Sequence, residues 1–202
     1  MSHYVRILAR QTDLPSLATL EARMHEKGLS VMLKMDKGSP TEWLQLTASH
    51  TSGTPITCVE RDIVAASRTA KREITELIKD AQNGLPKTSR AWVVNFLSSV
   101  KAIYAFQVLR GKEEQNGWAI FDCLLAAIFD SSQGIIHADR EGFSNEFGDD
   151  ALWLCSKPFG EVRRVAVLGG YCWLRFDLNL QNHKHCAAFR RGEVPDGVQT
   201  IV

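Results

Sequence analysis

Apolar and polar positions alternate at the start of the chain, with Val5, Ile7 and Ala9 on one side of an extended segment. This period of two predicts a half-buried strand over residues 3–9. Leucine and methionine residues at helical spacing follow, between Asp13, a candidate N-cap, and Gly28, a typical helix stop. Three more strands are expected at residues 29–35, 42–48 and 56–61, separated by turn-forming runs.

The middle of the chain shows helical periodicity of two kinds. From Ser67 onward, a narrow apolar stripe among many charged residues predicts a surface helix. A second helix, capped by Thr88 or Ser89, carries more apolar residues and should be better buried. Residues 102–109 are rich in strand-forming types, and residues 118–129 form an apolar helix that we expect to pack on a sheet face.

The C-terminal third returns to strand patterns. Strands are expected at residues 135–139, 151–155, 163–168 and 171–178, and Gly169-Gly170 predicts a hairpin turn between the last two. A short helix over residues 182–190 completes the pattern. These elements predict an α+β fold with mainly antiparallel sheets and packed helices.

The order of elements also suggests how the chain is organised. The segments that begin at His3 and Lys101 both predict a strand, a helix and then several antiparallel strands. We therefore expect one compact unit over residues 1–202. Within it, we hypothesise two pseudo-repeated β-α-β-β-β lobes, 1–64 and 101–202, joined by a helical segment, 65–100.

Composition and charge narrow the class of protein. Hydrophobic residues make up 45% of the 202 residues and the formal net charge is +1, so the chain should fold and lacks the long-range field of a non-specific nucleic-acid binder. The N-terminus does not match a secretory signal, and the longest charge-free apolar run, residues 123–129, is too short for a membrane span. We expect a soluble, cytoplasmic protein whose five cysteines are reduced core residues.

One acidic segment, residues 137–150, could carry chemistry. If the strand beginning at Ile135 continues, His137, Asp139 and Glu141 emerge on one face, with Glu146 and Asp149 nearby as further oxygen ligands for magnesium or calcium. The segment lacks the spacing of an EF-hand loop. The simpler interpretation is an acidic, solvated loop between two strands.

No other pattern identifies a catalytic residue or a cofactor. His183, His185 and Cys186 lack a second ligand pair at zinc-finger spacing, which favours surface or helix-cap histidines. The sequence contains no phosphate-binding glycine loop, nucleophile elbow or zinc-protease motif. We therefore expect no cofactor.

Four runs resemble a group of uncharacterised bacterial proteins of about this length. They are Ile103–Gln107, Gly117-Trp118, Gly134–Asn145 and Gly192–Pro195. In that group a form close to Asp-Gly-Glu-Gly-Phe recurs, and Arg140 stands here at the position of its first glycine. The resemblance implies a bacterial cytoplasmic protein without an assigned activity.

Three functional hypotheses follow. The first is a non-enzymatic binding or interaction protein with a protein partner, such as a bacterial immunity protein or accessory factor. The second is a metal-dependent hydrolase or nuclease that uses the acidic segment. The third is a small-ligand-binding protein with a pocket between the lobes, lined by Trp118, Trp153 or Trp173.

Overall fold

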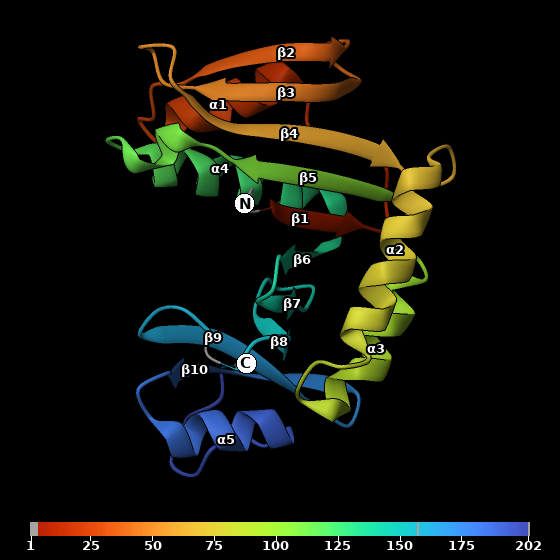
Figure 1. The fold of residues 1–202 in the computed structure, drawn as a ribbon. Helices are drawn as coiled ribbons and strands as arrows, with labels where there is room; N and C mark the ends of the chain where they lie inside the picture. The colour runs from red at the N-terminus through yellow and green to blue at the C-terminus, as the bar shows by residue number, and fades with distance from the viewer. Residues whose placement is uncertain (1–3, 157, 202) are drawn as a thin grey trace. The chain divides into compact units, whose positions relative to one another are not determined.

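A computed structural model describes residues 4–156 and 158–201, so His3 at the start of the first expected strand lies outside the described residues. The chain folds into two compact units (Figure 1). Unit 1 comprises Met1–Ala70 and Val100–Gly134, and unit 2 comprises Lys71–Ser99 and Ile135–Val202. Each unit is described by itself.

Unit 1 is built on five antiparallel strands in the order β1-β5-β4-β3-β2. β5 hydrogen-bonds to both β1 and β4, although two helices separate it from β4 along the chain. The strands are β1 (Tyr4–Ala9), β2 (Met32–Gly38), β3 (Trp43–Ser49), β4 (Pro55–Ile63) and β5 (Ala102–Val108).

The helices of unit 1 are α1 (Leu17–Glu26) and α4 (Gly117–Ser132), and a 3-10 turn, η1 (Arg110–Glu113), precedes α4. α4 packs against β1, β4 and α1, and its apolar stripe is buried (Figure 1). The Phe121 ring meets the Phe106 ring edge to face at 5.8 Å between centroids. The prediction that this helix packs on a sheet face is confirmed.

The first helix begins later than expected. Its N-cap is Ser16, whose hydroxyl accepts a hydrogen bond from Thr19 N at 3.2 Å, rather than Asp13. Two carbonyls of the preceding segment are instead used by side chains of the sheet: Tyr104 Oη donates to Asp13 O and Trp43 Nε1 donates to Pro15 O. These long-range hydrogen bonds hold the segment before Ser16 in a non-helical conformation.

Unit 2 contains five strands in the order β6-β7-β8-β9-β10, antiparallel except where β8 runs parallel to β9. They are β6 (Gly134–Ala138), β7 (Gly142–Ser144), β8 (Asp150–Trp153), β9 (Val162–Gly169) and β10 (Cys172–Asn179). The three-residue β7 was not expected, because it is too short to show alternation. Gly170, with φ of 69°, and Tyr171 form the two-residue turn of the β9–β10 hairpin, one residue beyond the predicted glycine pair.

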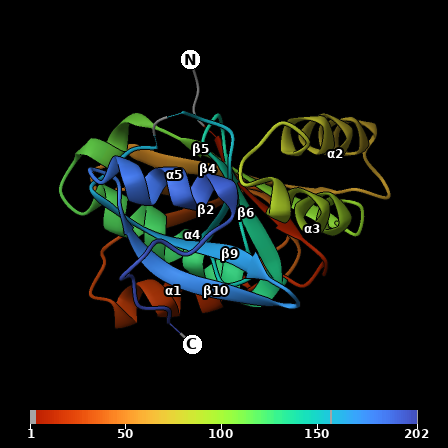
Figure 2. The ribbon, with the colours of Figure 1, turned by 90° about the horizontal axis from the view of Figure 1, so that it is seen from below.

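Three helices accompany the second sheet: α2 (Arg68–Ala81), whose first turn belongs to unit 1, α3 (Lys87–Leu97) and α5 (His183–Arg191). α3 contacts β8, β9 and α5, while α5 lies along the β9–β10 hairpin (Figure 2). The core beneath α5 consists of Trp153, Val165, Val167, Phe176, Leu178, Cys186 and Phe189.

The α+β class with mainly antiparallel strands is confirmed, but the units differ from the expected lobes. β5 and α4, which were assigned to the second lobe, belong to unit 1, and residues 71–99 belong to unit 2. The reason is the pairing of β5 between β1 and β4, which brings residues 100–134 back to the N-terminal strands.

The cysteines also differ in part from expectation. All five are free thiols, but only Cys186 is buried; Cys172 is exposed and the other three are half-buried. No helix in the described part of the chain is long and apolar enough to cross a bilayer.

Candidate functional site

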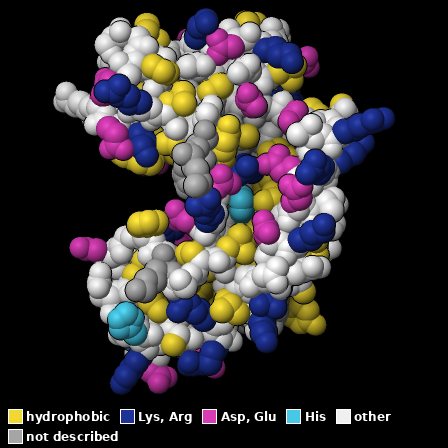
Figure 3. All heavy atoms as spheres, in the orientation of Figure 1, with side chains coloured by type: hydrophobic (Ala, Val, Ile, Leu, Met, Phe, Trp, Pro, Cys, Tyr) yellow, Lys and Arg dark blue, Asp and Glu magenta, His cyan; other side chains and the backbone are white. Residues whose placement is uncertain are grey.

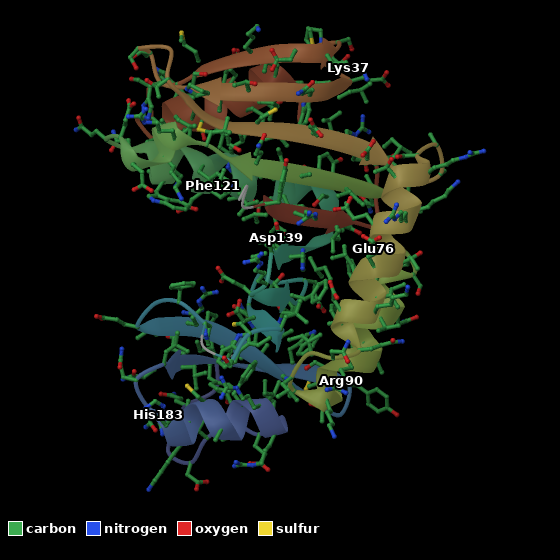
Figure 4. The ribbon with its side chains drawn as sticks, viewed as in Figure 1. Lys37, Glu76, Arg90, Phe121, Asp139 and His183 are labelled. Carbon is green, nitrogen blue, oxygen red and sulfur yellow. The ribbon has the colours of Figure 1, made fainter. Side chains whose placement is uncertain are left out.

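The acidic segment does not form the single strand face on which its metal hypothesis depended. β6 ends at Ala138, and Arg140 adopts a left-handed conformation with φ of 65°, so the chain turns before Glu141. Glycine adopts this conformation readily, whereas a residue with a side chain, such as Arg140, does so seldom. His137 is buried with its ring 4.6 Å from that of Phe143, while Asp139 lies in the turn that follows β6 (Figure 4).

Two carboxylates of unit 2 share one arginine. Arg163 Nη2 donates to Glu141 Oε2 at 2.7 Å, and its Nη1 donates to Asp150 Oδ2 at 3.3 Å. Trp153 Nε1 also donates to Asp150 Oδ2, at 3.0 Å. Burial raises the pKa of the Asp150 carboxyl, against the opposing charge of Arg163. These groups line a small cavity of 100 Å³.

Two further carboxylates of the segment, Glu146 and Asp149, accept hydrogen bonds from β10. Arg175 Nε donates to Asp149 Oδ2, and the side chain of Asp149 is only 5% exposed. The guanidinium of Arg175 also lies 4.6 Å from the centre of the Phe147 ring. Trp173 Nε1 donates to Glu146 Oε2 at 2.9 Å.

Glu141, Glu146, Asp149 and Asp150 therefore accept hydrogen bonds from arginine and tryptophan side chains of β8, β9 and β10. Within residues 4–156 and 158–201, no three His, Cys, Asp or Glu side chains are grouped so that they could hold a metal ion. The expected solvated loop is also inaccurate for Asp149, which is buried and paired. In unit 2 the segment ties β7 and β8 to the β9–β10 hairpin.

His183 and His185, the other histidine candidates, lie at the start of α5 (Figure 4 labels His183). The helix is capped by Asn182, whose Oδ1 accepts hydrogen bonds from Lys184 N and His185 N. Of the tryptophans expected to line a pocket, Trp118 belongs to unit 1 and is 47% exposed, whereas Trp153 is in the core of unit 2.

A pocket that the sequence did not reveal lies in unit 1. It measures 280 Å³ and is lined by three loops and one residue of α4. The loops are those between α1 and β2, between β3 and β4, and between η1 and α4. We call it the loop-cluster pocket; its lining residues are Gly28, Ser30, His50, Thr51, Ser52, Glu114, Gln115, Asn116 and Ile120.

His50 is held firmly in this pocket. It is 9% exposed, its backbone N donates to Thr54 O at 2.9 Å, and its Nε2 lies 2.8 Å from Gly111 O. A carbonyl oxygen can only accept, so Nε2 carries the proton. The Oε2 atom of Glu114 lies 3.8 Å from the same nitrogen. The imidazole is therefore fixed in orientation and in tautomer.

Asn116 at the N-cap of α4 departs from the usual capping geometry. N-cap residues normally have an extended backbone and accept a hydrogen bond from the first helical turn. Asn116 has φ of 63° instead, and its side chain makes no capping hydrogen bond. Its amide is thus not used to cap the helix that it begins.

Sequence reasoning missed this pocket because its residues look like ordinary turns. Residues 49–53 and 111–117 both have the composition of ordinary polar turns. Nothing local indicates that the two turns meet. A buried histidine in a turn is a recognisable signal only after burial is known.

Comparison with known proteins adds no relative: no protein-family model or curated protein matches the sequence, and no solved structure matches the fold.

Proposed function

We propose that this chain is a non-enzymatic binding protein and that the loop-cluster pocket of unit 1 is a site for a small polar ligand. The observation that carries this proposal is the convergence of three loops on one pocket, around a histidine fixed by two hydrogen bonds. Loops held on a rigid sheet are where binding residues commonly lie. A fixed imidazole lowers the entropy lost on binding.

Unit 1 has a larger depression of 390 Å³ beside β3 and β4, but it is less suited to a small ligand. Its wall includes the long charged side chains of Lys37, Glu60 and Arg61, whereas the hydroxyl groups of the loop-cluster pocket belong to short side chains (Figure 4 labels Lys37). Ordering such long side chains around a ligand costs conformational entropy. Side chains of both signs are also interspersed over the face drawn in Figure 3, which does not favour a strongly charged partner.

The binding test uses nuclear magnetic resonance of the ¹⁵N-labelled full chain. Glucose, galactose, myo-inositol, glycine and inorganic phosphate are each added to about 10 mM, because a 1 mM dissociation constant corresponds to only about −4.1 kcal/mol. We expect at least one probe to shift the amide signals of Thr51 and Asn116 in a saturable way. If none of the five does so, the pocket is not a binding site of this kind.

A matched pair of variants provides the control. Asn116→Gly removes the side-chain amide and keeps the left-handed backbone, which glycine tolerates. Gln133→Gly makes the same kind of change at the other end of α4, where Gln133 is exposed and has φ of 48°. Binding should weaken in the first variant and persist in the second.

The alternative, a metal-dependent hydrolase or nuclease that uses residues 137–150, stays a separate hypothesis with its own test. We expect no rise in melting temperature with magnesium, manganese or calcium. A metal present at a hundred times its dissociation constant would add about 2.7 kcal/mol of stability. A clear rise that Asp139→Ala abolishes would favour the hydrolase. The protein partner and the cytoplasmic location inferred from the sequence also stay predictions.

A further inference from the structure

We infer that the ligand of the loop-cluster pocket is a neutral, polyhydroxylated molecule, that is, a sugar or a polyol. This inference rests on the proposed function and adds the chemical class of the ligand. It follows from the kinds of side chain that line the pocket, from their charge and from the hydrogen bonds that they already make.

The pocket wall is dominated by neutral groups that both donate and accept hydrogen bonds. Three hydroxyl groups and two carboxamides line it, whereas Ile120 is its one large apolar side chain. Hydroxyl groups of a ligand also donate and accept, so each can pair with either function of such a wall. An apolar ligand would leave these groups without partners, at a cost of about 1–3 kcal/mol for each one buried. The five groups belong to Ser30, Thr51, Ser52, Gln115 and Asn116.

The charges at the pocket disfavour an anionic ligand. None of its nine lining residues in the described chain is lysine or arginine. The nearby Lys112 is engaged elsewhere, with its Nζ 3.6 Å from Glu113 Oε1 and 4.9 Å from the centre of the Trp118 ring. Phosphate sites in proteins typically use arginine or lysine. The carboxylate of Glu114 would repel an anion further.

A cationic ligand is also less suitable than a neutral one. The single carboxylate, Glu114, lies 3.8 Å from the imidazole of His50, and its side chain is 47% exposed. An ion pair between this exposed carboxylate and a cationic ligand would contribute little to affinity, because water screens it. The remaining recognition would have to come from the hydroxyl and amide groups, which suit a neutral molecule.

The size and geometry of the pocket agree with a sugar ring. A volume of 280 Å³ equals the space of about nine water molecules at roughly 30 Å³ each. Asn116 does not cap its helix, so both functions of its amide can pair with adjacent hydroxyl groups. Ser52 Oγ lies 3.3 Å from Thr54 Oγ1, which orients one hydroxyl of the wall.

The experiment compares ligand classes at the same site. In the titrations of the full chain, we expect glucose, galactose or myo-inositol to shift the amide signals of Thr51 and Asn116. The dissociation constant from these shifts should be at least tenfold lower than that of glycine or inorganic phosphate. Methyl glucoside, added as a further probe, distinguishes a free sugar from a sugar at a chain end. Asn116→Gly should weaken sugar binding about tenfold, because two hydrogen bonds are lost, and Gln133→Gly should not.

The outcomes separate this inference from the proposed function. Tighter binding of phosphate or glycine at Thr51 and Asn116 would overturn the sugar assignment and leave the binding function standing. Absence of binding by every probe would overturn both. Sugar binding that is unchanged in Asn116→Gly would place the ligand elsewhere and also overturn the inference.

Discussion

The buried ion pair between Arg175 and Asp149 gives the sharpest test of how unit 2 is held together. The Asp149 side chain is 5% exposed and that of Arg175 is 22% exposed. Arg175→Met removes the cation and leaves a buried carboxylate without its partner. Breaking a buried pair in this way typically costs about 3–5 kcal/mol. For a chain of this size the melting temperature should fall by roughly 6–20 °C.

A pair on the same hairpin provides the control. Arg164 Nε lies 2.5 Å from Asp177 Oδ1, but these side chains are 45% and 52% exposed. Arg164→Met should therefore cost less than about 1 kcal/mol. The double variant Arg175→Met with Asp149→Leu should recover much of the loss, because an apolar pair of similar volume removes the buried charge.

Urea unfolding of the four proteins measures these free energies, and amide hydrogen exchange of β9 and β10 reports unit 2 separately from unit 1. A cost for Arg175→Met no greater than that for Arg164→Met would refute the reasoning. So would a double variant that is less stable than the single one, since the destabilisation would then come from lost packing rather than from an unpaired charge.

Three further outcomes are expected. Burial raises the folded-state pKa of Asp150 above its unfolded value, so its contribution to stability is present at low pH and is lost as the pH rises through the folded pKa. Asp150→Asn should therefore weaken the pH dependence of the free energy of unfolding, measured with urea, above about pH 4. A steeper pH dependence would contradict this. Gly142→Ala should destabilise far more than Gly170→Ala in thermal unfolding, since a Cβ would lie 2.0 Å from Leu152 O at Gly142 and meets nothing within 4 Å at Gly170; equal losses would be inconsistent with this packing. Thiol titration should find five thiols after denaturation. In the native protein Cys172 should react first and Cys186 last, because burial shields the Cys186 thiol and raises its pKa. A disulfide would contradict this prediction.

The local elements were largely predictable. The helix expected at residues 118–129 is α4, and the strands expected at 163–168 and 171–178 are β9 and β10. These segments are long enough to show their period. β7 is three residues long and shows no period, while the start of α1 is set by hydrogen bonds from Tyr104 and Trp43.

The candidate site was predictable only as a set of residue types. The acidic segment does contain interacting side chains, but their partners Arg163 and Arg175 follow much later in the sequence. The loop-cluster pocket was not predictable at all, since His50 and Glu114 are in turns with unremarkable composition. Both features depend on contacts between segments that are far apart in the chain.

The sequence by itself determined the α+β class and the period of each long helix and strand, because these depend on residues close together in the chain. It also determined the formal net charge, which depends on composition alone. The tertiary structure alone decided that β5 lies between β1 and β4, that the carboxylates pair with arginines of β9 and β10, and that three turns surround His50. Strand order and side-chain partners follow from the lowest free energy of the whole packed unit. No local pattern records them.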